Sequence, residues 1–116
     1  MPDTNSTHRF QKNLNGGIAA LVLLAILDRA QDDLYGYEIA KRLADANGGV
    51  SIFKDGTVYP VLRKLAAAAL LTSRIVPSYS GPPRRYYRIT AQGREALGQW
   101  QAVWRETHTL VEHFIR

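Results

Sequence analysis

The sequence predicts a mainly α-helical protein with a two-stranded β-wing, that is, a winged helix-turn-helix followed by a long C-terminal dimerisation helix. Three observations predict this fold class. Apolar residues recur with a helical period in four segments, two short runs with β-type patterning flank a turn-rich loop, and basic residues gather around that loop. The chain has 116 residues, enough for one domain with its own hydrophobic core.

The N-terminal part is expected to hold a polar arm and a buried helix. Residues 1–12 lack apolar periodicity, so we expect a flexible arm there. A helix over Leu14–Ala30 follows, as the first element of a winged-helix domain over residues 13–90. The apolar run Ile18–Leu27 has ten residues, about half of what a bilayer span requires, so it predicts a core helix and no membrane contact.

Two further helices are expected before the wing. The second covers Tyr35–Ala46 and ends at Asn47-Gly48-Gly49, because both residue types accept the left-handed conformation at a helix C-terminus. The third covers Gly56–Ala69. Pro60 lies near its first turn, where a missing backbone N–H costs little.

The wing itself is expected as a hairpin. Its strands cover Leu71–Val76 and Arg85–Thr90, and in the second strand Tyr87 and Ile89 alternate with their neighbours at a period of two. The loop between the strands, Pro77–Pro83, is rich in turn-forming residues.

A last helix is expected over Ala91–Ile115, with Thr90 as its cap. Its apolar residues are close to a heptad spacing, with a second line beside them, so this helix is too apolar for a solvent-exposed tail. The first line is Leu97, Trp100, Trp104, Val111 and Phe114, and the second is Ala96, Val103 and Leu110.

The net charge of +5 is unevenly distributed. Between Lys54 and Arg94 there are eight basic residues and one acid, whereas the rest of the chain has seven basic residues and nine acids. Such a concentration favours a local site for a polyanion, although a solvated basic face would give the same composition.

A helix of this width fits the major groove of DNA, and its N-terminal half and the wing supply hydrogen-bond donors. The predicted DNA-binding residues are Lys54, Thr57, Tyr59, Arg63, Lys64, Arg84 and Arg85. For any single residue, exposure on a helix face or packing on the core is an equal alternative. The set as a whole favours binding to double-stranded DNA.

Three sequence blocks resemble the PadR family of bacterial transcription regulators, in that family's order and spacing. They are Tyr35-Gly36-Tyr37-Glu38-Ile39, the run from Gly56 to Leu65 (GTVYPVLRKL), and the run from Arg84 to Thr90 (RRYYRIT) with Gly93. The resemblance covers residues 17–116 and matches the short, single-domain branch. Ala66–Ala69 departs from it, because the family commonly has acidic residues and a glycine there.

The resemblance implies a homodimer in which the last helix makes most of the interface, so residues 91–116 are assigned to dimerisation. It also implies that the dimer binds a palindromic operator, usually as a repressor released by a small molecule. Trp100 and Trp104 lie four residues apart and therefore share a helix face. Some multidrug-responsive relatives bind flat aromatic compounds between aromatic residues of this helix, so both residues are predicted to bind a planar effector. Ordinary packing at an interface is the alternative.

Other function classes find little support. The chain has no cysteine, which excludes disulfides and thiol catalysis and favours the cytoplasm. The three histidines are His8, His108 and His113, and the last two are five residues apart on one helix, which is poor spacing for a shared metal. No catalytic residues, cofactor or metal are expected, so the protein is not predicted to be an enzyme. A winged-helix protein–protein module and a ligand sensor without DNA binding remain alternatives.

Overall fold

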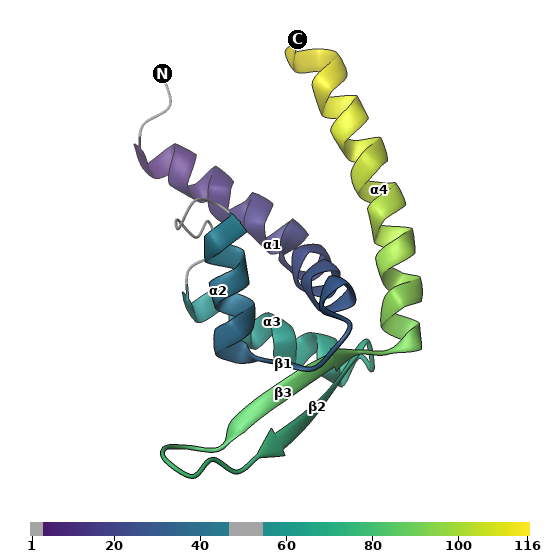
Figure 1. Ribbon diagram of the computed structural model, residues 1–116. Coiled ribbons are helices and arrows are strands. Elements are labelled where there is room, and N and C mark those ends of the chain that lie inside the picture. Colours follow the sequence, from purple (N-terminus) through teal and green to yellow (C-terminus); the bar gives the residue numbers. More distant parts are fainter. Residues whose placement is uncertain (1–3, 47–54) are drawn as a thin grey trace.

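The computed structural model describes residues 4–46 and 55–116, which form four helices and a small antiparallel sheet (Figure 1). The helices are α1 (Thr4–Ala30), α2 (Gly36–Ala46), α3 (Asp55–Ala67) and α4 (Ala91–Ile115). The strands are β1 (Leu34–Tyr35), β2 (Leu71–Val76) and β3 (Arg84–Ile89). The order of elements confirms a winged helix with a long C-terminal helix.

The first helix is longer than the sequence predicts. It begins at Thr4, so the part of the expected flexible arm from residue 4 to residue 12 is helical. All of these residues are exposed, and a local side-chain hydrogen bond from Gln11 to Asn15, four residues apart, supports this end of the helix. The expectation failed because the arm contains no helix breaker after Pro2 and can continue the helix without burying an apolar face.

The core forms where the second half of α1 meets α2, α3 and the sheet. Leu24, Ile39 and Leu62, one from each helix, are fully buried, and each such side chain contributes about 1.5–3 kcal/mol to folding. Tyr87 and Ile89 close the core from the sheet side, which confirms the alternation expected for β3.

Among the described helices, α1 meets the length and hydropathy criteria for a membrane span. A core helix meets the same criteria, and Leu23, Leu24 and Leu27 of α1 are in the core.

The sheet has three strands in the order β1-β3-β2. The hairpin of β2 and β3 pairs Leu71 with Ile89 and Val76 with Arg84. The expected two-stranded wing is thus extended by β1, whose two residues pair with Tyr86 and Tyr87. A two-residue strand is too short to show a period in the sequence.

The turn between α3 and β2 closes without a glycine. Ala69 has a φ of 63°, in the left-handed region, and its N–H donates to the carbonyl of Ala66 while the N–H of Leu70 donates to the carbonyl of Leu65. These two bonds form a Schellman motif. The helix α3 therefore ends at Ala67, two residues earlier than expected, and the turn forms despite the departure from the family pattern at Ala66–Ala69.

The start of α4 is fixed to this turn. The hydroxyl of Thr90 donates to the carbonyl of Ala69 (2.8 Å) and accepts from the N–H of Gly93 (2.9 Å), so the expected cap at Thr90 is confirmed. The Thr90 N–H donates to the carbonyl of Leu70 (3.1 Å). A β-carbon on Gly93 would lie 2.1 Å from that carbonyl oxygen, so only glycine fits there.

The long helices α1 and α4 meet near their junctions with the sheet and diverge toward the two chain termini (Figure 1). Leu97 is buried and Trp100 packs against the core, but the following turns of α4 are largely exposed. The large apolar residues of α4 that are exposed are Val103, Trp104, Leu110, Val111, Phe114 and Ile115.

Candidate nucleic-acid interface

A concave surface of about 330 Å³ lies between α3, the start of α2 and the strand β3. Tyr59 and Arg63 line it from α3, and Arg84 and Arg85 line it from β3. Of the seven residues predicted to bind DNA, the structure brings these four together at one site.

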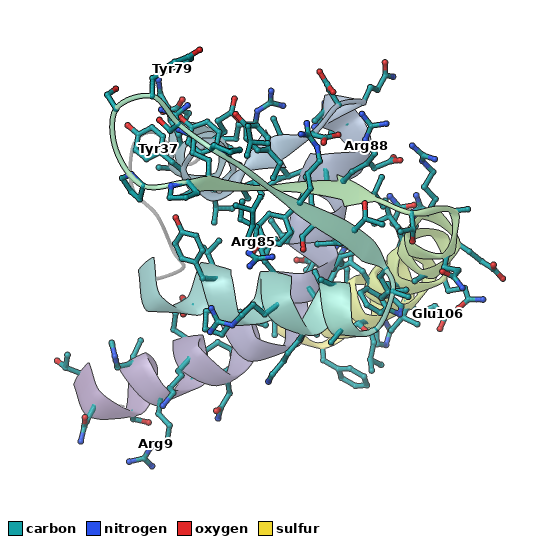
Figure 2. All side chains as sticks on the ribbon, turned by 90° about the horizontal axis from the view of Figure 1, so that it is seen from below. Arg9, Tyr37, Tyr79, Arg85, Arg88 and Glu106 are labelled. Carbon is teal, nitrogen blue, oxygen red and sulfur yellow. The ribbon has the colours of Figure 1, made fainter. Side chains whose placement is uncertain are left out.

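Strand alternation separates Arg85 from Arg88 of β3. Arg85 shares the inward face of the strand with the buried Tyr87, whereas Arg88 lies on the outward face. Figure 2 shows Arg85 directed between the sheet and α3, and Arg88 on the opposite side of the sheet. Arg85 and Arg88 of the same strand therefore belong to two different surfaces.

Local contacts hold both wing arginines that line the concave surface. The Arg84 guanidinium lies over the ring of Tyr35, 4.6 Å from its centroid. Arg85 Nη1 donates to the hydroxyl of Ser73 (3.1 Å) on the neighbouring strand. In the described part of the chain, neither guanidinium pairs with a carboxylate, so both charges remain available to an anion.

Two tyrosines, Tyr87 and Tyr59, line the concave surface between the arginines of the wing and α3. Tyr87 is almost fully buried, and this burial raises the pKa of its hydroxyl, while the charges of Arg85 and Arg63 act in the opposite direction. The hydroxyl is therefore protonated at neutral pH. Above it, Tyr59 is 44% exposed, and its ring packs directly against the backbone of Gly36 at the start of α2.

Not every basic residue of the Lys54–Arg94 segment is available for a polyanion. Arg74 Nε lies 2.7 Å from Asp33 Oδ2, Arg88 is in direct contact with the other oxygen of Asp33, and Arg94 lies 3.3 Å from Asp28. The Arg74 guanidinium that hydrogen-bonds Asp33 lowers the pKa of this carboxyl, burial acts in the opposite direction, and Arg88 lowers it further. Acids before the segment thus neutralise part of the charge that composition alone assigns to it.

Of the three remaining predicted residues, two lie elsewhere and one is outside the described residues. Thr57 is half-buried at a small internal space beside Leu23 and Leu43, so it belongs to the contact between helices α1, α2 and α3. Lys64 is exposed on α3 but does not line the concave surface. Lys54 and the predicted end of the second helix at Asn47-Gly48-Gly49 lie outside the described residues.

Two exposed tyrosines near this surface and the wing, Tyr37 and Tyr79, are not among the residues predicted to bind DNA. Tyr37 lines the concave surface from α2 and stacks on Tyr35, with ring centroids 6.1 Å apart. Tyr79 is fully exposed in the loop between β2 and β3, at the end of the wing (Figure 2). In the sequence, Tyr79 could have been identified by its position in the turn-rich loop. Tyr37 could have been identified by its position beside Gly36 at the start of a helix.

A second, apolar groove of about 380 Å³ lies between α1 and α4. Trp100, Val103 and Trp104 line it from α4, which confirms that the two tryptophans share a helix face. Gly17, Ala20 and Leu21 line it from α1, a contribution that the sequence did not indicate.

Among the described residues, no group of three or more potential metal ligands is close enough to hold an ion.

The family model for the PadR-like transcriptional regulators matches residues 23–99. A transcriptional regulator from Clostridium thermocellum is similar with a TM-score of 0.80 and 25% identity, over 90% of this chain and 99% of the other. A PadR-like transcription factor from Bacteroides fragilis has a TM-score of 0.71 and 30% identity, over 90% and 97%. Bacillus subtilis PadR, solved with operator DNA, shares the fold (TM-score 0.64, 24% identity, 72% of this chain and 46% of that one).

Proposed function

Because this chain belongs to the PadR-like family of transcriptional regulators, we propose that it represses transcription as a homodimer that binds a palindromic operator and is released by a small-molecule effector. The observation that carries the DNA-binding part is the concave surface where Tyr59 and Arg63 of α3 meet Arg84 and Arg85 of the wing. A protein that acts on DNA in this way works in the bacterial cytoplasm.

The geometry supports a defined mode of binding. In this mode α3 enters the major groove, Tyr59 and Arg63 reach base edges, and Arg84 and Arg85 contact the adjacent phosphates. Arg84 and Arg85 are free of carboxylate partners in the described residues, whereas charge-paired arginines would first have to break an ion pair. Bacillus subtilis PadR, with the same fold, was solved in complex with operator DNA.

The test is a titration of the protein with its own upstream DNA by gel shift and by fluorescence anisotropy at several salt concentrations. Replacing Arg84 and Arg85 by alanine is expected to weaken binding and to reduce the slope of log K against log salt by about 0.9 for each lost phosphate contact. Arg105→Ala, on the exposed part of α4, is the matched control and should leave the slope unchanged. Equal slopes for all three proteins would show that the wing does not bind DNA.

The proposed dimer rests on the exposed apolar residues of α4. A row that includes Leu110, Val111 and Phe114 lies on a helix that extends away from the core, and a second copy of the same helix is the surface that would cover it. Leu110→Glu is expected to shift the mass measured by light scattering from dimer to monomer. Thr109→Glu places the same charge on an exposed position on the other side of α4, away from the row, and should not.

The proposed effector site is the groove lined by Trp100 and Trp104. Its floor is apolar, and Trp104 is 41% exposed, so a planar aromatic molecule can stack on the indole. Planar cationic and phenolic compounds are expected to quench the tryptophan fluorescence and to release the protein from its operator. In Trp104→Phe the release should require more ligand. Quenching without any gel shift in the absence of ligand would instead support a sensor that does not bind DNA.

A further inference from the structure

One carboxylate is placed between two arginines of the wing. Asp33, just before β1, receives a hydrogen bond from Arg74 of β2 through one oxygen (2.7 Å) and from Arg88 of β3 through the other. Asp32 adds a second contact to Arg88 at 3.3 Å. The segment between α1 and β1 therefore joins both strands of the hairpin at once.

These arginines lie on the outward face of the sheet, away from α3. Arg74 of β2 pairs in register with Tyr86 of β3, and Arg88 follows Tyr86 by two residues in β3. Both guanidinium groups are therefore on one face of the sheet. Their side chains are 62% and 58% exposed. Without Asp33 they would present two more positive charges on the wing, beside Arg84.

Asp33 is held firmly enough to keep both partners. Its side chain is only 12% exposed, whereas that of Asp32 is 79% exposed. Arg74 also lies over the ring of Tyr86, 5.2 Å from the centroid, which fixes the guanidinium from a second side. A DNA phosphate would have to displace a carboxylate that already accepts charge-assisted hydrogen bonds from both arginines.

We propose that Asp33 withholds Arg74 and Arg88 from DNA and thereby restricts the phosphate contacts of the wing to Arg84 and Arg85. The inference rests on the proposed DNA binding and assigns Asp33 a positioning role in it. Its consequence is a lower affinity for DNA of any sequence, because phosphate contacts supply most of the non-specific affinity. Binding at the operator also uses base contacts from α3 and depends less on the number of wing charges.

The experiment compares the full chain with Asp33→Asn on a duplex of scrambled sequence, by fluorescence anisotropy between low and moderate salt. The asparagine keeps the size of the side chain and removes its charge. We expect tighter binding to the scrambled duplex and a salt slope that steepens by about 0.9 for each arginine set free, hence by up to about 2. The ratio of operator to scrambled affinity should fall.

Glu106→Gln is the matched control, since it makes the same change of net charge on α4, the helix that extends away from the sheet (Figure 1). It should leave the slope at the wild-type value. A wild-type slope in Asp33→Asn overturns the inference while the proposed function stands. Absence of any salt-dependent DNA binding by the wild type overturns both.

Single substitutions of the arginines test the same point without touching Asp33. Arg88→Gln should leave the slope on the scrambled duplex unchanged, because this arginine makes no phosphate contact in the wild type. Arg84→Gln should reduce it by about 0.9. Equal reductions in the two variants would show that Arg88 reaches DNA despite Asp33 and would overturn the inference.

Discussion

Gly36 and Tyr59 are in a contact that leaves no room for a side chain at position 36. A β-carbon there would lie 2.4 Å from Cε1 of the tyrosine ring and 3.0 Å from its hydroxyl oxygen. The start of α2 thus sets the position of a tyrosine on α3, and that tyrosine lines the concave surface proposed to bind DNA.

Gly36→Ala is therefore expected to move the ring of Tyr59. The clashing atoms are at the far end of a side chain that is 44% exposed, so the ring can rotate and the stability loss should be about 1 kcal/mol, at the low end for overpacking. DNA affinity should fall more clearly, by several-fold. Urea unfolding and anisotropy on the operator measure the two effects.

A double-mutant cycle isolates the contact. In a Tyr59→Ala background no ring opposes the new methyl group, so Gly36→Ala should be neutral or slightly stabilising there. The same loss of stability in both backgrounds would mean that the contact with Tyr59 is not the reason for a glycine at position 36.

Ala69→Gly is expected to stabilise the protein. Ala69 has a φ of 63°, and the left-handed conformation costs an alanine about 1–2 kcal/mol. Glycine avoids this cost but loses more entropy on folding, so a net gain of about 0.5–1 kcal/mol should remain. Ala67→Gly, at the last residue of α3, is the control and should lower the melting temperature instead. Calorimetry at one protein concentration compares the three.

Gly93→Ala should be among the most damaging small substitutions. Its β-carbon would lie 2.1 Å from the backbone oxygen of Leu70 and 2.7 Å from a side-chain carbon of Ile89, and a backbone group cannot rotate away. We expect a loss of about 3 kcal/mol or more. Gly98→Ala, on the same helix with nothing within 4 Å of the new atom, should instead be slightly stabilising. Thermal unfolding of the wild type and the two variants measures both changes in stability.

The contribution of Asp33 to stability should depend on pH. Since Arg74 lowers the pKa of this carboxyl below its ordinary value of 3.8, the contribution is complete above that value and is lost as the pH falls through the lower, folded-state pKa. The difference in unfolding free energy between wild type and Asp33→Asn should be constant near neutral pH and shrink below about pH 4. Urea titrations at a series of pH values measure it. A difference that grows on acidification would contradict the assignment.

The sequence was sufficient for features with a strong periodic signal. The β2 strand and the bounds of α4 were predicted to the residue, because a turn-rich loop and a heptad pattern mark them. The length of α1 was wrong, since residues 4–12 bury nothing and leave no pattern. The strand β1 was missed because it exists only through its pairing with β3.

The candidate site was predicted by composition but not by geometry. Residue types and spacing were enough to select Tyr59, Arg63, Arg84 and Arg85, which the structure gathers around one concave surface. The role of Asp33 could not be found in this way. It lies 41 and 55 residues from its two arginine partners, and only the folded sheet brings them together.

The hydrogen bonds around Thr90 also indicate which parts of the molecule unfold together. The turn after α3, the end of β3 and the first turn of α4 share the carbonyls of Ala69 and Leu70 and the side chain of Thr90, so breaking any one bond exposes the others. The amide protons of Leu70, Thr90 and Gly93 should therefore exchange with solvent in one cooperative event. The helices α3 and α4 then form a single unfolding unit.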